Sequence, residues 1–143
     1  MKWHEDAKTR ANIGDQAESR FARDVRCHCG GEFTFIGNAY PGCPDFTCSN
    51  CEQLVDIKYS PQAERTGNIA VSAIPWSKYP DDLLLITFYH GKWIAGYKRD
   101  IRTSNNDPFA PTHRSRATRF YLIACDQLQP IQDFGLTVKK RTN

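Results

Sequence analysis

The chain lacks any apolar segment long enough to cross a bilayer, and it has no internal repeat or low-complexity tract. Its longest apolar run, residues 83–89, has the length of a buried strand. Met1 to Asp6 lack the apolar core of a secretory signal, so we expect an intracellular, cytoplasmic protein. Because disulfides are rare in the cytosol, the six cysteines are expected to be reduced thiols or metal ligands.

What the chain does contain is the composition of an ordinary globular protein. Its 143 residues, 40% hydrophobic and 24% charged, predict a single domain, residues 1–143, with one core. Residues 1–57 carry six Lys and Arg against nine Asp and Glu, a net −3, whereas residues 58–143 carry thirteen against seven, a net +6. An acidic first half could bind a metal ion, and a basic second half could hold a polyanionic ligand beside it. A solvated, mildly basic surface explains the asymmetry too, and the count alone slightly favours that explanation.

The hydrophobic pattern predicts a mixture of helix and strands. A helix over residues 13–26 is expected from apolar residues that recur on one face: Ile13, Ala17, Phe21 and Val25. Strands are expected at residues 32–36, 45–48, 53–58, 68–74 and 120–125, and a hairpin at 83–90 and 92–98. Residues 62–65 are either a loop or a helical turn. Residues 103–119 are expected to form a long flexible loop and residues 138–141 a frayed tail.

Two carboxylates converge in the predicted hairpin of residues 45–58. The four-residue connection, Ser49 to Glu52, sets Asp45 opposite Asp56, and directly opposed side chains lie about 5 Å apart on one face. Lys58, two residues beyond Asp56, projects from the same face. Like charges at that separation repel, so the pattern favours an oxygen cage for a hard divalent cation. A turn residue at Asp45 and a solvated strand face at Asp56 and Lys58 form the alternative, which leaves the opposed acids unexplained.

Two closely spaced thiol pairs predict a structural zinc site. The ligands are expected to be Cys27, Cys29, Cys48 and Cys51, in an insertion spanning about residues 27–51. The first pair is one residue shorter than usual, so His28 or Cys43 could replace a thiolate. Reduced or disulfide-bonded cysteines without metal are the alternative. Because the second pair lies in the turn between the acid-bearing strands, zinc would brace that hairpin.

Glu18, Pro44-Asp45 and Asp56-Ile57-Lys58 resemble the motif of the PD-(D/E)XK nuclease superfamily. The likeness covers about residues 13–98, with Gly42 to Phe46 and Thr66 to Asn68 adding to it, and the inserted cysteine pairs depart from it. The resemblance implies an α/β fold, a restriction-endonuclease-like core in which helices flank a central mixed β-sheet.

The resemblance also implies a role for each motif residue. Asp45, Asp56 and the carbonyl of Ile57 would bind magnesium or manganese. Lys58 would orient or deprotonate the attacking water and help neutralise the scissile phosphate. Glu18 would reach the metal or its water from the helix, although Glu18 also fits a capping box three residues after Asp15.

These interpretations lead to two functional hypotheses. The first is a magnesium-dependent nuclease that hydrolyses DNA, or RNA in a variant of the same idea, with a structural zinc. The second is a non-catalytic zinc-ribbon protein that binds nucleic acid. Arg114, Arg116 and Arg119 are candidate phosphate contacts, with a solvated loop as the alternative. Trp76, Tyr79 and Trp93 are candidate stacking surfaces, with a core position as the alternative for Trp93. Cutting both strands of a duplex with one centre per chain would require a homodimer or two events.

Overall fold

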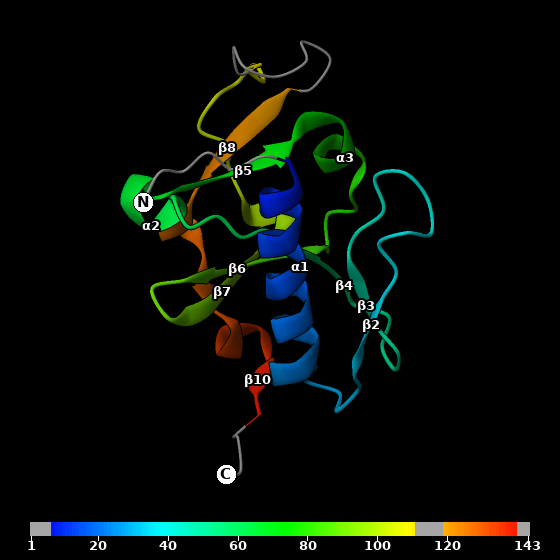
Figure 1. The fold of residues 1–143 in the computed structure, drawn as a ribbon. Coiled ribbons are helices and arrows are strands. Elements are labelled where there is room, and N and C mark those ends of the chain that lie inside the picture. Colours follow the sequence, from blue (N-terminus) through cyan, green and yellow to red (C-terminus); the bar gives the residue numbers. More distant parts are fainter. Residues whose placement is uncertain (1–6, 111–118, 140–143) are drawn as a thin grey trace.

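A six-stranded mixed sheet forms the centre of the protein, and the long helix α1 (Ala7–Asp24) crosses one of its faces (Figure 1). The computed structural model describes residues 7–110 and 119–139, with side chains from residue 15 onward. The strand order is β2 (Phe33–Phe35), β3 (Phe46–Cys48), β4 (Leu54–Ile57), β6 (Leu84–Tyr89), β7 (Lys92–Tyr97) and β9 (Gln129–Pro130). Within the described sheet β4 and β6 are parallel and all other neighbours are antiparallel. The predicted α/β class with a mixed sheet is therefore confirmed.

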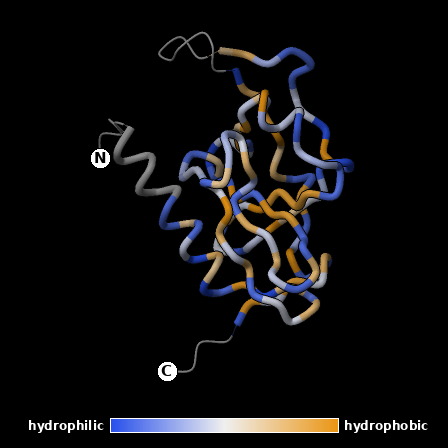
Figure 2. Tube along the Cα trace, turned by 90° about the vertical axis from the view of Figure 1, so that its right-hand side faces the viewer, coloured by the Kyte–Doolittle hydropathy of each residue, from blue (hydrophilic) through white to orange (hydrophobic). Residues whose placement is uncertain are grey.

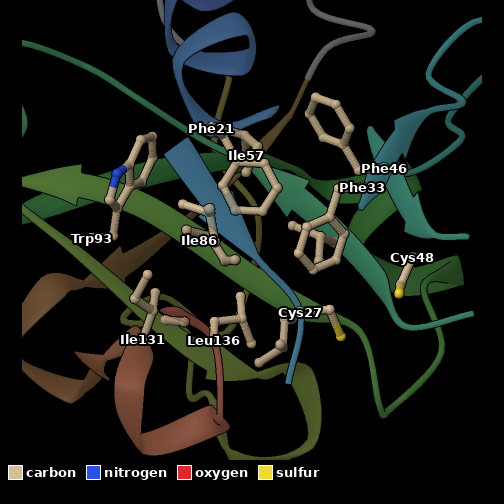
Figure 3. Packing of buried hydrophobic residues seen from close by; sticks show 14 of the residues in the cluster. Phe21, Cys27, Phe33, Phe46, Cys48, Ile57, Ile86, Trp93, Ile131 and Leu136 are labelled. Atoms are coloured by element: carbon tan, nitrogen blue, oxygen red, sulfur yellow. The ribbon is translucent and has the colours of Figure 1, made fainter. Parts of the chain in front are cut away.

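The apolar stripe of α1 packs on this sheet through Phe21, which is fully buried. Its ring centroid lies 5.0 Å from that of Phe33, 5.3 Å from that of Phe46 and 5.7 Å from that of Trp93 (Figure 3). Ala17 and Val25 are buried with it, as the spacing predicts. This contact fixes α1 over the middle of the sheet.

The bounds of α1 differ from the prediction at both ends. The helix begins at Ala7, because residues 7–12 contain no helix breaker, and it ends at Asp24. Val25 and Arg26 instead form β1 (Val25–Arg26). Asp15 therefore lies in the interior of the helix. A capping residue must stand at the start of a helix, where backbone N–H groups have no helical partner. The capping-box interpretation of Glu18 is wrong.

The opposite face of the sheet is covered by a two-stranded ribbon, β5 (Asn68–Ser72) with β8 (Phe120–Ala124), and by the short helix α3 (Ala73–Lys78). The residues of β6 alternate between the two cores: Leu84 and Ile86 pack toward α1, and Leu85 packs toward the ribbon. A strand buried on both faces explains why residues 83–89 are almost continuously apolar. Residues predicted as one strand, 68–74, change to helix at Ala73.

Most short-range predictions hold. The β6–β7 hairpin turns at His90 and Gly91, which both have positive φ (49° and 76°), and it pairs Tyr89 with Lys92. The predicted choice between loop and helical turn at residues 62–65 resolves as α2 (Ala63–Thr66). The described ranges also contain the 3₁₀ turns η1 (Lys98–Asp100), η2 (Cys125–Gln127) and η3 (Ile131–Phe134). Cys125, at the start of η2, is buried in the core.

The C-terminal segment returns to the end of α1. β10 (Thr137–Val138) pairs with β1 through Val25 and Val138, and the Lys139 N–H donates to the Asp24 carbonyl at 2.7 Å. The prediction of a frayed tail is therefore wrong at Val138, because β1 offers it backbone partners. Residues 140–141 of that tail, and residues 111–118 of the predicted loop, lie outside the described residues.

Hydropathy follows this layering, since hydrophobic segments gather toward the centre of the trace and hydrophilic segments at the outer turns (Figure 2). In the described ranges, no helix has both the length and the apolar character that crossing a membrane requires.

Candidate cation site and cysteine cluster

The β3–β4 hairpin has the register that the sequence predicts. Phe46 pairs with Val55 and Thr47 with Leu54. The Cys48 N–H donates to the Gln53 carbonyl at 2.9 Å, which continues this register toward the turn. In the other direction the same register sets Asp45 opposite Asp56.

Asp56 points to the side of the sheet that carries Tyr79, and Asp45 lies close enough to interact with both Asp56 and Glu18 of α1. Oδ2 of Asp45 accepts a hydrogen bond from the Ile57 N–H at 2.8 Å, which fixes one carboxylate oxygen against the neighbouring strand. Asp56 is only 1% exposed, and its neighbours Val55 and Ile57 in β4 are apolar and buried. A buried carboxylate of this kind is costly unless charges or donors compensate it.

Two groups compensate Asp56 in part. The Tyr79 O–H donates to its Oδ1 at 3.3 Å, and the Lys58 Nζ lies 3.1 Å from its Oδ2. The approach of Lys58 brings the charges together, but Oδ2 has no partner with hydrogen-bond geometry among the described residues. Lys58 therefore lies on the Asp56 face as predicted, and one buried carboxylate oxygen retains acceptor capacity.

The pKa values of the site reflect burial and crowded negative charge. Burial, followed by the charge of Asp56, raises the pKa of Asp45 to about 8. Glu18, which projects from α1, also has a raised pKa, mainly through burial, and its side chain interacts with Asp45. For Lys58, burial lowers the pKa, but the attraction of Asp56 and Asp45 outweighs it, so the net pKa rises. Three acids and one ammonium group thus act on one another in one place.

Tyr79 lies in a different environment from the open surface that the sequence predicts. It was expected as a stacking surface, but it is 8% exposed and its hydroxyl is directed at Asp56. Its main chain is also held, because the Lys98 Nζ donates to the Tyr79 carbonyl at 2.6 Å. Burial, and then the charge of Asp56, raises the pKa of Tyr79. No local sequence signal indicates this role, because α3 brings Tyr79 to the site from a distant part of the chain.

The other candidate nucleic-acid contacts include two buried rings and one exposed arginine. Trp76 and Trp93 are each 6% exposed, so the core interpretation of Trp93 is correct and neither ring is an open stacking platform. Arg119 is exposed, and its Nη1 donates to the Pro108 carbonyl at 3.5 Å. Arg114 and Arg116 lie outside the described residues.

The four predicted zinc ligands gather into one cluster. The sulfur atoms of Cys27, Cys29, Cys48 and Cys51 all lie within 4.8 Å of one another, a spacing that fits a tetrahedral metal such as zinc. Gly31 permits this approach, because a Cβ at that position would come within 2.6 Å of the Cys48 sulfur. The described part of the chain therefore contains a donor set that could hold one metal ion.

Neither alternative ligand is needed in this cluster. The Cys43 thiol instead donates to the Ile36 carbonyl at 3.1 Å, and the His28 Nδ1 lies 3.4 Å from the Cys27 sulfur, beside the cluster. The pKa of Cys29 is lowered to about 6, chiefly by the hydrogen bond from the Gly31 backbone, whereas burial raises that of Cys27 to about 12. The set thus includes a thiol that ionises readily at neutral pH.

The two sites lie on opposite faces of one hairpin. Cys48 belongs to the core beneath α1, whereas Asp56 faces Tyr79 on the other side. The turn that carries Cys51 joins the two acid-bearing strands. A metal in the cluster would therefore stabilise the hairpin without touching the carboxylates.

Comparison with known proteins gives little beyond this geometry. No protein-family model matches the chain, and no curated protein matches it. Among solved structures, a nuclease from a fusselovirus is similar with a TM-score of 0.44 and 10% sequence identity, over 90% of this chain and 83% of that chain. A likeness this weak does not bear on the chemistry of the site.

Proposed function

We propose that the protein is a divalent-metal-dependent nuclease that hydrolyses DNA phosphodiester bonds at a centre formed by Asp45, Asp56 and Lys58. Glu18 completes the centre from α1. Zinc held by the cluster of Cys27, Cys29, Cys48 and Cys51 braces the catalytic hairpin. The proposal includes the assignment to the PD-(D/E)XK superfamily that the sequence motif indicates.

The observation that carries the proposal is the incomplete compensation of Asp56. This carboxylate is 1% exposed, its Oδ2 has the Lys58 ammonium at 3.1 Å as its one neighbouring charge of opposite sign among the described residues, and the carboxyl groups of Asp45 and Glu18 lie close by. A buried carboxylate that is not fully compensated destabilises the folded state, and such groups are concentrated at functional sites. A hard divalent cation offsets the repulsion and uses the free acceptor capacity.

The donor set fits magnesium or manganese. Asp45 and Asp56 would hold the ion with the Ile57 carbonyl, and Glu18 would bind the ion or one of its waters. Such an ion, when bound, polarises a phosphoryl oxygen and makes a bound water a better nucleophile near neutral pH.

Lys58 would act on the phosphate rather than on the water. Its raised pKa keeps the side chain an ammonium ion at neutral pH, so it is a poor base. As a cation it would neutralise the negative charge that develops on the scissile phosphate. Of the two roles that the family resemblance implies, electrostatic stabilisation is therefore the one that we propose.

The substrate would be held by basic side chains outside the metal centre. Arg119, with Arg114 and Arg116, would contact the phosphate backbone. Two chains acting as a homodimer would cut the two strands of a duplex. DNA is proposed over RNA on the motif alone, so both are included in the test.

Incubation of the purified protein with plasmid, linear, single-stranded and branched DNA, and with RNA, tests the proposal. Cleavage should require added Mg²⁺ or Mn²⁺ and should fall at least 100-fold in Asp45→Asn, Asp56→Asn and Lys58→Met. Asp100→Asn and Lys78→Ala are matched controls at exposed positions and should cut like the parent. Circular dichroism verifies that each variant is folded.

Cleavage that survives all three site substitutions would remove the assigned centre and would indicate a contaminating nuclease. Nucleic-acid binding without cleavage by the parent, in the presence of either metal, would favour the non-catalytic zinc-ribbon hypothesis.

A further inference from the structure

A groove that the nuclease motif does not include runs between α1 and the β6–β7 hairpin. Its first part has a volume of about 560 Å³ and is lined by residues that include Asp15, Ser19, Arg20, Tyr59, Phe88 and Trp93. Its second part, of about 550 Å³, shares Arg20, Phe88 and Trp93 and continues past Lys92 and Gln132. The two parts of the groove therefore adjoin each other at these three residues. Each part is within the size range of ligand-binding pockets.

The groove begins beside the acid cluster. Tyr59 directly follows Lys58, and Ser19 directly follows Glu18. Asp15, at the same end, is close enough to Glu18 to contribute to its raised pKa. A strand whose phosphate reached Lys58 would therefore find this groove next to it.

The middle of the groove combines positive charge with an aromatic surface. The Arg20 guanidinium carbon lies 5.1 Å from the centre of the Phe88 ring, a cation–π arrangement. Within the described residues Arg20 forms no ion pair with a carboxylate, in contrast to Arg23, whose Nε lies 2.9 Å from Asp24 Oδ1. The stacked guanidinium keeps its in-plane N–H donors available for a phosphate.

Further groups along the groove have the same character. Tyr59 and Phe88 are half-buried, so each presents part of its ring to the groove, and Lys92 is exposed at the far end. Cationic side chains spaced along partly exposed aromatic rings are typical of surfaces that bind single-stranded nucleic acid, where unpaired bases are free to stack. In a duplex the bases are already stacked on one another and do not offer their faces.

We infer that this groove binds the single-stranded segment of nucleic acid that flanks the scissile bond, with a phosphate at Arg20 and a base against Tyr59. The inference depends on the proposed function for its description of the scissile bond. Binding itself needs no catalytic step, so the two are tested apart.

Fluorescence anisotropy with a labelled single-stranded oligodeoxythymidylate, in buffer without added Mg²⁺ or Mn²⁺, measures the binding. Arg20→Ala should weaken the dissociation constant about tenfold, the loss expected for one charged hydrogen-bonded contact. The slope of log K against log salt should fall by about 0.7, the value for one phosphate contact on a single strand. Lys92→Ala should lower the slope in the same direction.

Arg99→Ala is the matched control, because Arg99 is also exposed and stacks on an aromatic ring, at 4.2 Å from the centre of Tyr97, outside the groove. It should bind within twofold of the parent. Equal binding by Arg20→Ala and Arg99→Ala would overturn the inference, as would equal, Arg20-dependent binding of a duplex of the same length.

The competing occupants give different results. A second copy of the chain in the groove would appear as self-association in sedimentation that Arg20→Ala abolishes, and that result would overturn the inference. If the parent binds the oligonucleotide through Arg20 but never cleaves DNA with Mg²⁺ or Mn²⁺, the groove is supported and the proposed nuclease fails. If cleavage depends on Asp45 but Arg20→Ala binds normally, only the groove assignment fails.

Discussion

At the scale of single residues, the protein holds a carboxylate pair that its own side chains do not fully neutralise. Asp45 has a pKa near 8, chiefly because of burial and then because of the Asp56 charge. The metal-free folded protein therefore binds more protons than the unfolded chain between the ordinary Asp pKa of 3.8 and about 8. Its free energy of unfolding should fall as pH rises through that window, because the unfolded chain ionises first.

Asp45→Asn tests this linkage. The amide keeps an oxygen that can accept from the Ile57 N–H, but it removes the charge. We expect the metal-free variant to be more stable than the parent at pH 8, by roughly 1–3 kcal/mol, with a smaller difference at pH 5. Urea unfolding followed by circular dichroism at both pH values measures it.

Added Mn²⁺ should stabilise the parent at pH 8 and leave Asp45→Asn unchanged, since only the parent keeps the charged ligand. Asp100→Asn serves as the control, and a stability difference independent of pH would contradict the assigned ionisation.

Tyr79 is the residue that we expect to position Asp56. Tyr79→Phe removes the O–H that donates to Asp56 Oδ1 and keeps the ring. We expect kcat to fall about tenfold and the Mg²⁺ concentration for half-maximal activity to rise, with KM for DNA unchanged, because the ligand loses its orientation but the DNA surface is intact.

Tyr97→Phe is the control for the loss of a tyrosine hydroxyl, since Tyr97 lies on β7 away from Asp56. A change confined to thermal stability, with the Mg²⁺ dependence unaltered, would show that Tyr79 is structural only.

At the scale of elements, the β3–β4 hairpin is short, and its four described strand residues in β4 give it few ladder hydrogen bonds. The cysteine cluster at its turn supplies what the strands lack. Structural zinc contributes on the order of 10 kcal/mol to small folding units, comparable with the stability of a whole domain. The geometry of Asp45 against Asp56 should therefore depend on the metal.

Cys51→Ser tests the cluster most cleanly. Cys51 is exposed, so its substitution leaves no core cavity, and a loss of stability would report the metal. Elemental analysis should give about one zinc per parent chain and much less in the variant, with a lowered melting temperature. Cys43→Ser, at a buried thiol outside the cluster, should keep its zinc. Zinc-free parent protein, purified fresh and reduced, would defeat the assignment.

At the scale of the whole molecule, the C-terminal segment closes the core beneath α1. Ile131 and Leu136 are buried in the same cluster as Phe21 (Figure 3). β10 pairs with β1 at the end of the helix. The position of α1, and with it of Glu18, thus depends on residues at the far end of the sequence.

Leu136→Ala should lower the free energy of unfolding by about 2–5 kcal/mol, because Leu136 is 1% exposed and its truncation leaves a cavity. Val138→Ala, two residues later but 44% exposed, should cost less than about 1 kcal/mol. Denaturant unfolding compares the two, and equal effects would contradict the assigned packing of this segment.

Local sequence determined the parts of the fold whose partners are close in the chain. The four-residue connection after Cys48 fixes the β3–β4 register and so the facing of Asp45 and Asp56, and His90-Gly91 fixes the β6–β7 turn. The paired cysteines likewise lie in tight turns. In each case the covalent chain limits the geometry to few alternatives.

Tertiary structure decided what depends on contacts between distant segments. The hydroxyl of Tyr79 reaches Asp56 only because Tyr79, at the end of α3, packs in the second core with Leu85, and Val138 becomes a strand only because β1 offers it backbone partners. Trp76 is 6% exposed, so it lies in a core and not on a binding surface, again because of contacts with distant segments. Hydrophobic burial is not directional, so the sequence indicates which side chains are buried but not which residues they contact.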